Sequence, residues 1–315
     1  MNTLLGHVNH PKGPGDFCIW FNKWRTTLIQ QRDANTHPDP ARAQIWRNST
    51  KSLISVLGVI ENGFADFDMI QIVPADIAVF LDQWEGRRAA QVYRSYLSKF
   101  FEWGCRRGIV NSNPAREISL STPPKRDVYM TDKQYNQIKK ALLFGNDGKP
   151  TRTGEMVQCY MDLLYLLYQR GTDVRLLRWD QIKDDGIMFK PSKTERTSGI
   201  KVLIPISDDM QKVFAKLKDL SKMRSIYLIH TEHGQPYSAN GIGSLFRRAC
   251  KRVNIEGVTL KDIRAKAATD ATNKGYLESQ LQTALAHTDA ATTRGYIRTR
   301  QIPVSEVILK LPKIE

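Results

Sequence analysis

The chain has 315 residues, enough for two domains, and its 41% hydrophobic and 25% charged residues are ordinary for a globular protein. Lys and Arg number 47 against 32 Asp and Glu, which gives a formal charge of +15. This excess favours nucleic acid as a partner over a membrane surface, because the sequence has neither a basic amphipathic helix nor a lipidation motif. Charge alone leaves open a basic protein with no polyanionic partner.

The cysteines and the absence of common motifs exclude further classes of protein. Cys18, Cys105, Cys159 and Cys250 lie far apart, without CxxC or Cys/His metal spacing, so we expect reduced, packed thiols in a cytoplasmic protein. The first residues lack a signal-peptide core, and no apolar run reaches the roughly 18 residues of a membrane span. GxGxxG and GxxxxGK[ST] are absent too. We therefore expect no metal, no other cofactor and no membrane partner.

The first part of the chain predicts a small all-helical unit rich in Arg and Lys. Residues 1–15, rich in Gly and Pro, are expected to be a flexible lead-in. Apolar periodicity then predicts helices at residues 16–31, 40–60, 74–84 and 89–107. Pro74 opens the third helix at a favoured first-turn position, and Gly108 ends the fourth.

A change of composition separates this unit from a second, mixed one. Residues 111–125 hold three prolines among Ser and Thr, which is typical of a linker. Beyond them Thr131 caps a helix, and residues 156–168 are apolar nearly all round, which predicts a buried helix. The β-rich runs 186–190 and 201–206, joined by the polar residues 192–199, predict a hairpin. Further helices are expected at residues 239–253, 260–273, 277–286 and 290–298.

Two basic residues of the second unit are candidates for anion binding. Arg170 ends the predicted buried helix, and a buried arginine needs an anionic partner. That partner is either Asp173, three residues on along the same helical face, or an external anion. Lys193 lies on the hairpin loop, where it is either solvated or reaches into a neighbouring cleft to hold a phosphate or donate a proton.

A second pair of cations lies near the start of the helix predicted at residues 260–273. Thr259 and Asp262 resemble a capping box, although Asp is a weaker fourth member than Glu. Lys261 and Arg264 are three residues apart and share one helical face. Since a helix N-terminus already favours anions, two cations there suit a bound phosphate. The alternative is a solvated basic face.

The last candidates are His287 and Tyr296. Taken singly, each residue type is more often structural than catalytic. A tyrosine with its ordinary pKa of about 10 is a poor nucleophile at neutral pH. Surrounding cations would favour the phenolate and so activate it.

The order and spacing of these residues resemble the catalytic boxes of the tyrosine recombinases, the phage integrase family. The segments that carry the resemblance are residues 169–179 (QRGTDVRLLRW), 191–194 (PSKT) ahead of 204–206 (IPI), 261–264 (KDIR), 285–287 (LAH), and Tyr296 nine residues after the histidine. Residues 230–237 and 246–251 resemble the stretch before the second arginine box, and residues 72–77 and 111–114 resemble the family's core-binding domain. The resemblance covers roughly residues 16 to 300.

The resemblance implies a mainly α fold in two domains. A helical core-binding (SAM-like) domain at residues 16–118 would precede a linker at 119–128 and an α+β catalytic domain at 129–300 with a small antiparallel β-hairpin. The tail, residues 301–315, would pack on its own domain or dock on a neighbouring protomer. We expect no arm-binding domain, because only some 15 residues precede the first helix.

The resemblance also implies a mechanism of site-specific DNA recombination without ATP. Arg170 and Arg264 would clamp the phosphate, with His287 as donor or proton shuttle, and Lys193 would protonate the leaving 5′-hydroxyl. Tyr296 would attack and form a 3′-phosphotyrosyl link. The expected partners are double-stranded DNA recombination sites, further copies of the chain in a tetramer, and accessory DNA-bending proteins. The expected location is the cytoplasm, at the nucleoid, for a bacterial or phage-encoded protein of integration or mobile elements.

At two positions the match to the family is not one to one. Arg175 competes with Arg170 as the first arginine, and we choose Arg170 because an acidic residue follows it at three positions and a Trp at nine. Lys261 stands where the family usually has His, and protonated Lys donates a hydrogen bond but does not accept a proton. Lys261 therefore stays a phosphate contact, while a deprotonated Lys261, another group or water takes the tyrosine proton. This departure supports one rival, a catalytically inactive DNA-binding regulator; the other rival is a type IB topoisomerase-like enzyme.

Overall fold

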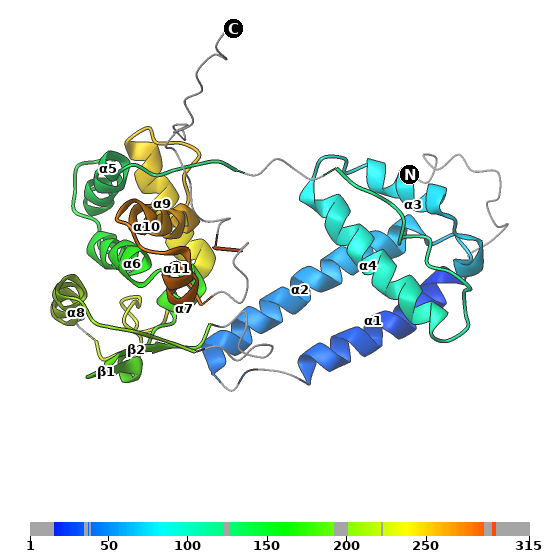
Figure 1. Ribbon diagram of the computed structural model, residues 1–315, viewed down its shortest axis with the longest axis horizontal. Coiled ribbons are helices and arrows are strands. Elements are labelled where there is room, and N and C mark those ends of the chain that lie inside the picture. The colour runs from blue at the N-terminus through cyan, green and yellow to red at the C-terminus, as the bar shows by residue number, and fades with distance from the viewer. Residues whose placement is uncertain are drawn as a thin grey trace, which may run out of the picture. The chain divides into compact units, whose positions relative to one another are not determined.

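The computed structural model describes residues 16–34, 37, 39–121, 126–191, 201–221, 223–286 and 292–293. The chain divides into two compact units, residues 1–125 and 126–315 (Figure 1). The described residues are mainly helical, and their strands form one small antiparallel sheet in the second unit. The predicted fold class is therefore confirmed. None of the described helices combines the length and the apolar composition that crossing a membrane requires.

In its described residues the first unit consists of four α-helices and one short 3₁₀ turn at Met69–Gln71. The helices are α1 (Phe17–Asp33), α2 (Pro40–Gly63), α3 (Pro74–Asp82) and α4 (Arg88–Cys105). They lie where apolar periodicity predicted them. The Asp39 carboxylate caps α2 by accepting from the backbone N–H of Arg42 at 2.9 Å, and proline opens both α2 and α3. Gly108, with φ of +67°, ends the turn after α4.

The core of the first unit combines phenylalanine rings with aliphatic side chains. Helix α1 packs on α2 and α4, and α4 also packs on α2 and α3. The rings of Phe17 and Phe21 stack at 5.2 Å, and each meets Phe100 edge-on, at 5.2 and 5.0 Å. Such offset and edge-on arrangements add to the stabilisation that burial of the rings provides. The buried apolar face of α1 is therefore part of the core of the unit.

The second unit is organised around one buried helix. Its helices are α5 (Asp132–Leu143), α6 (Gly154–Leu167), α7 (Gly171–Arg175), α8 (Asp208–Leu220), α9 (Ala239–Arg252), α10 (Leu260–Asn273) and α11 (Glu278–Ala284). Helix α6 packs against α5, α8 and α10, which surround it in Figure 1, and most of its residues are buried. The prediction of a buried helix at residues 156–168 is confirmed, because only a helix covered on most sides keeps so many apolar residues from water.

The sheet confirms the predicted pairing of the two β-rich runs. Strand β2 (Gly186–Phe189) pairs antiparallel with β3 (Val202–Ile204), with Ile187 opposite Ile204 and Met188 opposite Leu203. A further strand, β1 (Ile182–Lys183), adds to the other edge of β2. The residues that join β2 to β3, at positions 192–199, lie outside the described residues.

Two elements differ from the expectations. Helix α8 was not predicted, although Ser207 caps it by accepting from the backbone N–H of Met210 at 3.3 Å. Helix α11 is shorter than the predicted 277–286 helix; Leu285 is its C-cap, and Ala286, with a φ of +50°, has left the helical backbone. The helix predicted at residues 290–298 falls outside the described residues except for positions 292 and 293.

Candidate active site

Arg170 begins a short helix instead of ending the long one. Helix α6 ends at Leu167 because Tyr168 adopts a left-handed backbone, with φ of 56°. Arg170 is then extended, and its carbonyl accepts from the backbone N–H of Asp173 at 2.9 Å and of Val174 at 3.1 Å to start α7. The expectation that Arg170 ends the buried helix is therefore wrong. The break changes the direction of the chain and brings the arginine to a cavity.

This cavity has a volume of about 430 Å³ and lies among residues of α6, α7, α9 and α10 and of the turns before them. It is lined by Tyr160, Leu164, Arg170, Gly171, Thr172, Arg175, Ala239, Ile242, Leu260, Lys261 and Arg264. None of these lining residues carries a carboxylate. The structure thus brings three of the predicted site residues, Arg170, Lys261 and Arg264, to one cationic cavity. The buried Nη1 of Arg170 has no hydrogen-bond partner within the described part of the chain.

The start of α10 positions two of these cations. The Asp262 carboxylate accepts from the backbone N–H of Thr259 at 2.7 Å and from its Oγ1 at 2.9 Å, so this pair caps the helix as predicted. Asp262 also pairs with Arg126 at 2.7 Å. Lys261 is exposed, whereas Arg264 is 3% exposed and donates through Nη2 to the Leu285 carbonyl at 2.9 Å. Both cations line the cavity beside the helix N-terminus, where the helix dipole also favours an anion.

Lys193, His287 and Tyr296 lie outside the described residues. Their neighbours along the chain are described: β2 and β3 lie on either side of the segment that contains Lys193, and Leu285 is two residues before His287. The hydrogen bond from Arg264 to the Leu285 carbonyl therefore joins α10 to the chain that leads to His287. The roles assigned to these three residues stay predictions.

Arg175 was weighed only as a rival to Arg170, yet both line the cavity. Arg175 is 6% exposed, and its Nη1 donates to the carbonyl of Tyr237. Burial lowers the pKa of its guanidinium from the ordinary value. Tyr160, also buried, donates its hydroxyl to the Gly171 carbonyl at 2.9 Å. The sequence signal for Arg175 was its place inside an apolar run, Val-Arg-Leu-Leu, where a solvated arginine is not expected.

A second feature that the sequence did not reveal is a network of ion pairs and hydrogen bonds around Lys266 of α10. Lys266 is 2% exposed and pairs with Asp132, at the start of α5, and with Asp270 at 2.8 Å. The hydroxyls of Tyr129 and Tyr165 also donate to Asp270, at 2.8 and 2.9 Å. Burial acts to lower the pKa of Lys266, but the bonds to the two carboxylates outweigh it and raise the pKa above the ordinary value. This network attaches α10, which carries Lys261 and Arg264, to α5 and α6.

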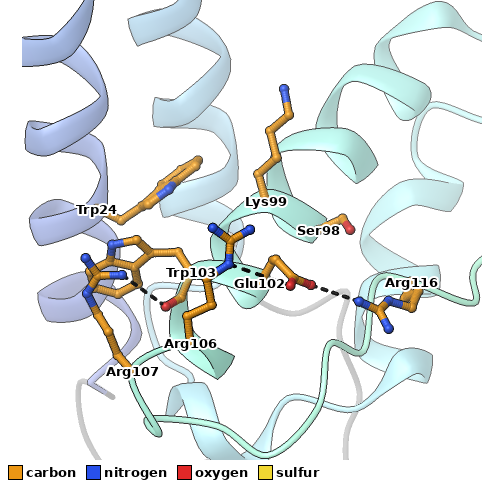
Figure 2. A pocket seen from close by; sticks show the side chains of 8 residues that line it. All are labelled: Trp24, Ser98, Lys99, Glu102, Trp103, Arg106, Arg107 and Arg116. Atoms are coloured by element: carbon orange, nitrogen blue, oxygen red, sulfur yellow. Dashed lines mark hydrogen bonds and ion pairs between the residues drawn. The ribbon is translucent and has the colours of Figure 1, made fainter.

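The first unit has a basic and aromatic cavity of its own, of about 360 Å³ (Figure 2). It is lined by Trp24, Ser98, Lys99, Glu102, Trp103, Arg106, Arg107 and Arg116. The guanidinium of Arg107 lies 4.4 Å from the centre of the Trp103 ring, and Glu102 pairs with Arg116 at 2.9 Å. Cations beside aromatic rings are the composition that nucleic-acid surfaces use, because bases stack on rings and phosphates pair with cations.

The thiols and the acidic side chains give no sign of a metal site in the described parts of the chain. Within them, no group of His, Cys, Asp and Glu side chains is arranged to hold an ion. All four cysteines are free; Cys159 and Cys250 are buried, and burial raises the pKa of each thiol to about 11.

Comparison with known proteins agrees with this geometry. The phage integrase family model matches residues 129–301, more than half of the chain. A lambda integrase tetramer bound to a Holliday junction is similar in structure, with a TM-score of 0.74 and 20% identity over 95% of this chain and 82% of that one. A lambda integrase (75–356) dimer bound to a COC' core site has a TM-score of 0.72 and 20% identity, over 93% of this chain and 99% of the other.

A further solved structure is similar at lower sequence identity. It is the Tn1549 transposon integrase in complex with transposon right end DNA, with a TM-score of 0.72 and 14% identity over 90% of this chain and 95% of that one. No curated protein matches the sequence. At these identities the solved structures show the fold, while the family model shows the family.

Proposed function

The chain belongs to the phage integrase family, the tyrosine recombinases, and we propose that it is a site-specific recombinase that cuts and rejoins double-stranded DNA through a covalent 3′-phosphotyrosyl intermediate. The observation that supports this most directly is the cavity that Arg170, Lys261 and Arg264 share without a lining carboxylate. A cavity of this size and charge suits one phosphodiester. The three cations come from two segments far apart in the sequence, so it is the fold that brings them to one anion site.

Arg170 and Arg264 would hold the non-bridging oxygens of the phosphate to be cut. Phosphoryl transfer increases the negative charge on these oxygens, so fixed cationic donors stabilise the transition state more than the ground state. Guanidinium groups suit this role because their planar N–H donors form bidentate bonds to two oxygens. The buried Nη1 of Arg170, which no described residue bonds, is a donor that such an oxygen would satisfy.

Tyr296 would be the nucleophile. Its phenolic oxygen attacks the phosphorus and forms a phosphotyrosyl bond, the bond from phosphorus to the 5′-oxygen breaks, and Lys193 gives that oxygen a proton. His287 would donate a hydrogen bond to the phosphate or relay a proton. The phosphodiester is exchanged for another phosphate ester, so a 5′-hydroxyl of a new strand reverses the step without ATP.

Lys261 would contact the phosphate as a donor. Lys261 is exposed and lines the cavity, a position that suits a cationic donor meeting DNA from the solvent side. A protonated lysine has no acceptor, so the proton of Tyr296 passes to water or to another group. The departure from histidine therefore changes the proton transfer and leaves the phosphate contact.

Residues 16–118 would bind DNA as the core-binding domain, and residues 129–300 would cut it. The solved relatives support DNA as the partner, since they include a dimer on a core site and a tetramer on a Holliday junction. The cationic and aromatic cavity of the first unit supports it independently (Figure 2). Recombination would take place in a tetramer on two DNA sites, with residues 301–315 docked on a neighbouring protomer, at the nucleoid of a bacterial cell.

A suicide substrate tests the chemistry. We would recover the DNA site by selecting bound duplexes from a random library, then place a nick beside the cut so that religation fails. The wild-type chain is expected to form an adduct that survives denaturant, and Tyr296→Phe is expected to form none. An adduct that persists in Tyr296→Phe would contradict the assignment.

The same assay separates the second candidate, a DNA-binding regulator without chemistry, which the lysine at position 261 favours. A regulator would bind the selected site with high affinity and form no adduct. Relaxation of supercoiled plasmid that lacks the site would instead indicate a type IB topoisomerase-like enzyme.

A further inference from the structure

Arg175 is a buried cation that lacks a counter-charge in the described chain. It lies at the end of α7, is 6% exposed, and lines the same cavity as Arg170, Lys261 and Arg264. Its one described hydrogen bond runs from Nη1 to the Tyr237 carbonyl, which is a neutral acceptor. No Asp or Glu among the described residues forms an ion pair with it.

Burial without a counter-charge is unfavourable for the Arg175 guanidinium. Arginine is rarely buried without an anionic partner, because the protein interior solvates a charge less well than water does. The pKa of the Arg175 guanidinium agrees with this cost, because burial lowers it from the ordinary value. The groups that act to raise this pKa are Tyr160 and Tyr227, and neither is a carboxylate. A neutral side chain with one N–H would bond the Tyr237 carbonyl without the cost of burying a charge. The hydrogen bond alone therefore does not account for an arginine here.

We propose that Arg175 takes its counter-charge from the substrate and is a fourth cationic contact to the phosphate that the cavity binds. The Tyr237 carbonyl holds one end of the guanidinium, while a guanidinium has five N–H donors in all and so retains others for an anion. That this anion is a DNA phosphodiester rests on the proposed function. The presence of an anion site is inferred from the cavity alone and does not rest on that function. In this arrangement α7 supplies cations at both its start and its end.

The test measures how tightly the full chain binds inorganic phosphate. Binding is read from the rise of the thermal unfolding temperature as phosphate is added. Phosphate replaces chloride in the buffer, so that the ionic strength stays constant. Arg175→Gln keeps a donor for the Tyr237 carbonyl and removes the charge, and Arg175→Lys keeps the charge. Lys212→Gln is the matched control, because Lys212 is exposed on α8 and pairs with Asp209 outside the cavity. A charged hydrogen bond to an anion predicts that Arg175→Gln weakens phosphate binding roughly ten- to a hundredfold.

The outcomes separate a substrate contact from a structural role. Arg175→Lys should retain most of the phosphate affinity, and Lys212→Gln all of it. Phosphate binding by Arg175→Gln as tight as that of the wild type would overturn the proposal. If Arg175→Gln and Arg175→Met both failed to fold while Arg175→Lys folded, the charge would serve the fold itself, and the proposal would be overturned as well.

The DNA reaction gives a second readout. On the suicide substrate at saturating DNA, Arg175→Gln should form the adduct roughly tenfold or more slowly than the wild type, and Arg175→Lys should restore most of the rate. An unchanged rate in Arg175→Gln would contradict the contact. Failure of the wild type to form any adduct would contradict the proposed function, and the phosphate measurement would still decide whether Arg175 belongs to an anion site.

Discussion

Replacing Lys266 by methionine tests whether the network of ion pairs and hydrogen bonds around this residue stabilises the second unit. The change keeps the apolar stem and removes the ammonium from between Asp132 and Asp270. Breaking a buried pair by removing one partner costs about 3–5 kcal/mol when the other charge stays uncompensated. Here the loss is smaller, because the Asp132 side chain is 86% exposed and regains water, and Asp270 keeps the hydroxyl donors of Tyr129 and Tyr165. We therefore expect a loss of about 2 kcal/mol.

The assays are guanidinium and thermal unfolding of the full chain, with hydrogen exchange measured on peptides of α10. A loss of about 2 kcal/mol corresponds to a fall of about 4–8 °C in unfolding temperature for a unit of this size. Asp132→Asn is the control, and it should cost about 1 kcal/mol or less because most of that side chain is in water. A Lys266→Met chain within about 0.5 kcal/mol of the wild type, with unchanged exchange in α10, would refute the reasoning.

The sign of the pH dependence follows from the raised pKa of Lys266. A lysine whose pKa is higher in the folded state contributes its full stabilisation below the ordinary lysine pKa of about 10.4 and loses it as the pH rises through the folded value. The difference in stability between Lys266→Met and the wild type should therefore be constant between roughly pH 6 and 9. A difference that vanished within this window would contradict the pairing.

Three further outcomes follow from the described residues. Arg107→Gln, at the cavity of Figure 2, should lower the slope of log affinity for DNA against log salt by about 1 if this cation contacts a phosphate, as a titration from low to high salt would show. Cys159 and Cys250, whose pKa values burial raises to about 11, should resist Ellman's reagent at pH 8 until the chain unfolds. Burial raises the pKa of Tyr160 and Tyr165, so above about pH 10 the unfolded chain releases protons that the folded chain keeps, and stability falls as pH rises; absorbance at 295 nm should show these tyrosines ionising only with unfolding.

Apolar periodicity predicted most helices because each buries one face, and two β-rich runs joined by a polar segment predicted that β2 and β3 would pair. Helix α8 was overlooked although Ser207 and the buried Met210, Phe214 and Leu217 give it a cap and an apolar face. Its many charged residues obscured that spacing. The end of α6 was misplaced for a different reason. Tyr168 leaves the helix with a left-handed backbone, which no local residue preference predicts for tyrosine.

The order of the basic residues along the chain predicted that Arg170, Lys261 and Arg264 belong together, and they line one cavity. The sequence could not show that Arg175 reaches the same cavity, because α7 is short and its direction depends on the break at Tyr168. It also could not show Lys266, since a buried lysine is recognised only through its partners, and these come from segments distant in sequence. Contacts between side chains from distant segments depend on tertiary packing, and neither the composition nor the residue spacing of one segment predicts them.

Tyr296 is proposed to form the covalent bond to DNA, and the most direct test is to identify the residue that carries the adduct. The wild-type chain would be trapped on a suicide substrate, digested with trypsin and nuclease, and examined by mass spectrometry. Because Arg294 and Arg298 bracket the tyrosine, trypsin releases residues 295–298 as a tetrapeptide. We predict the mass of a phosphonucleotide on this peptide, located at Tyr296. A phosphonucleotide on any other residue, or binding to the selected site without an adduct, would contradict the account.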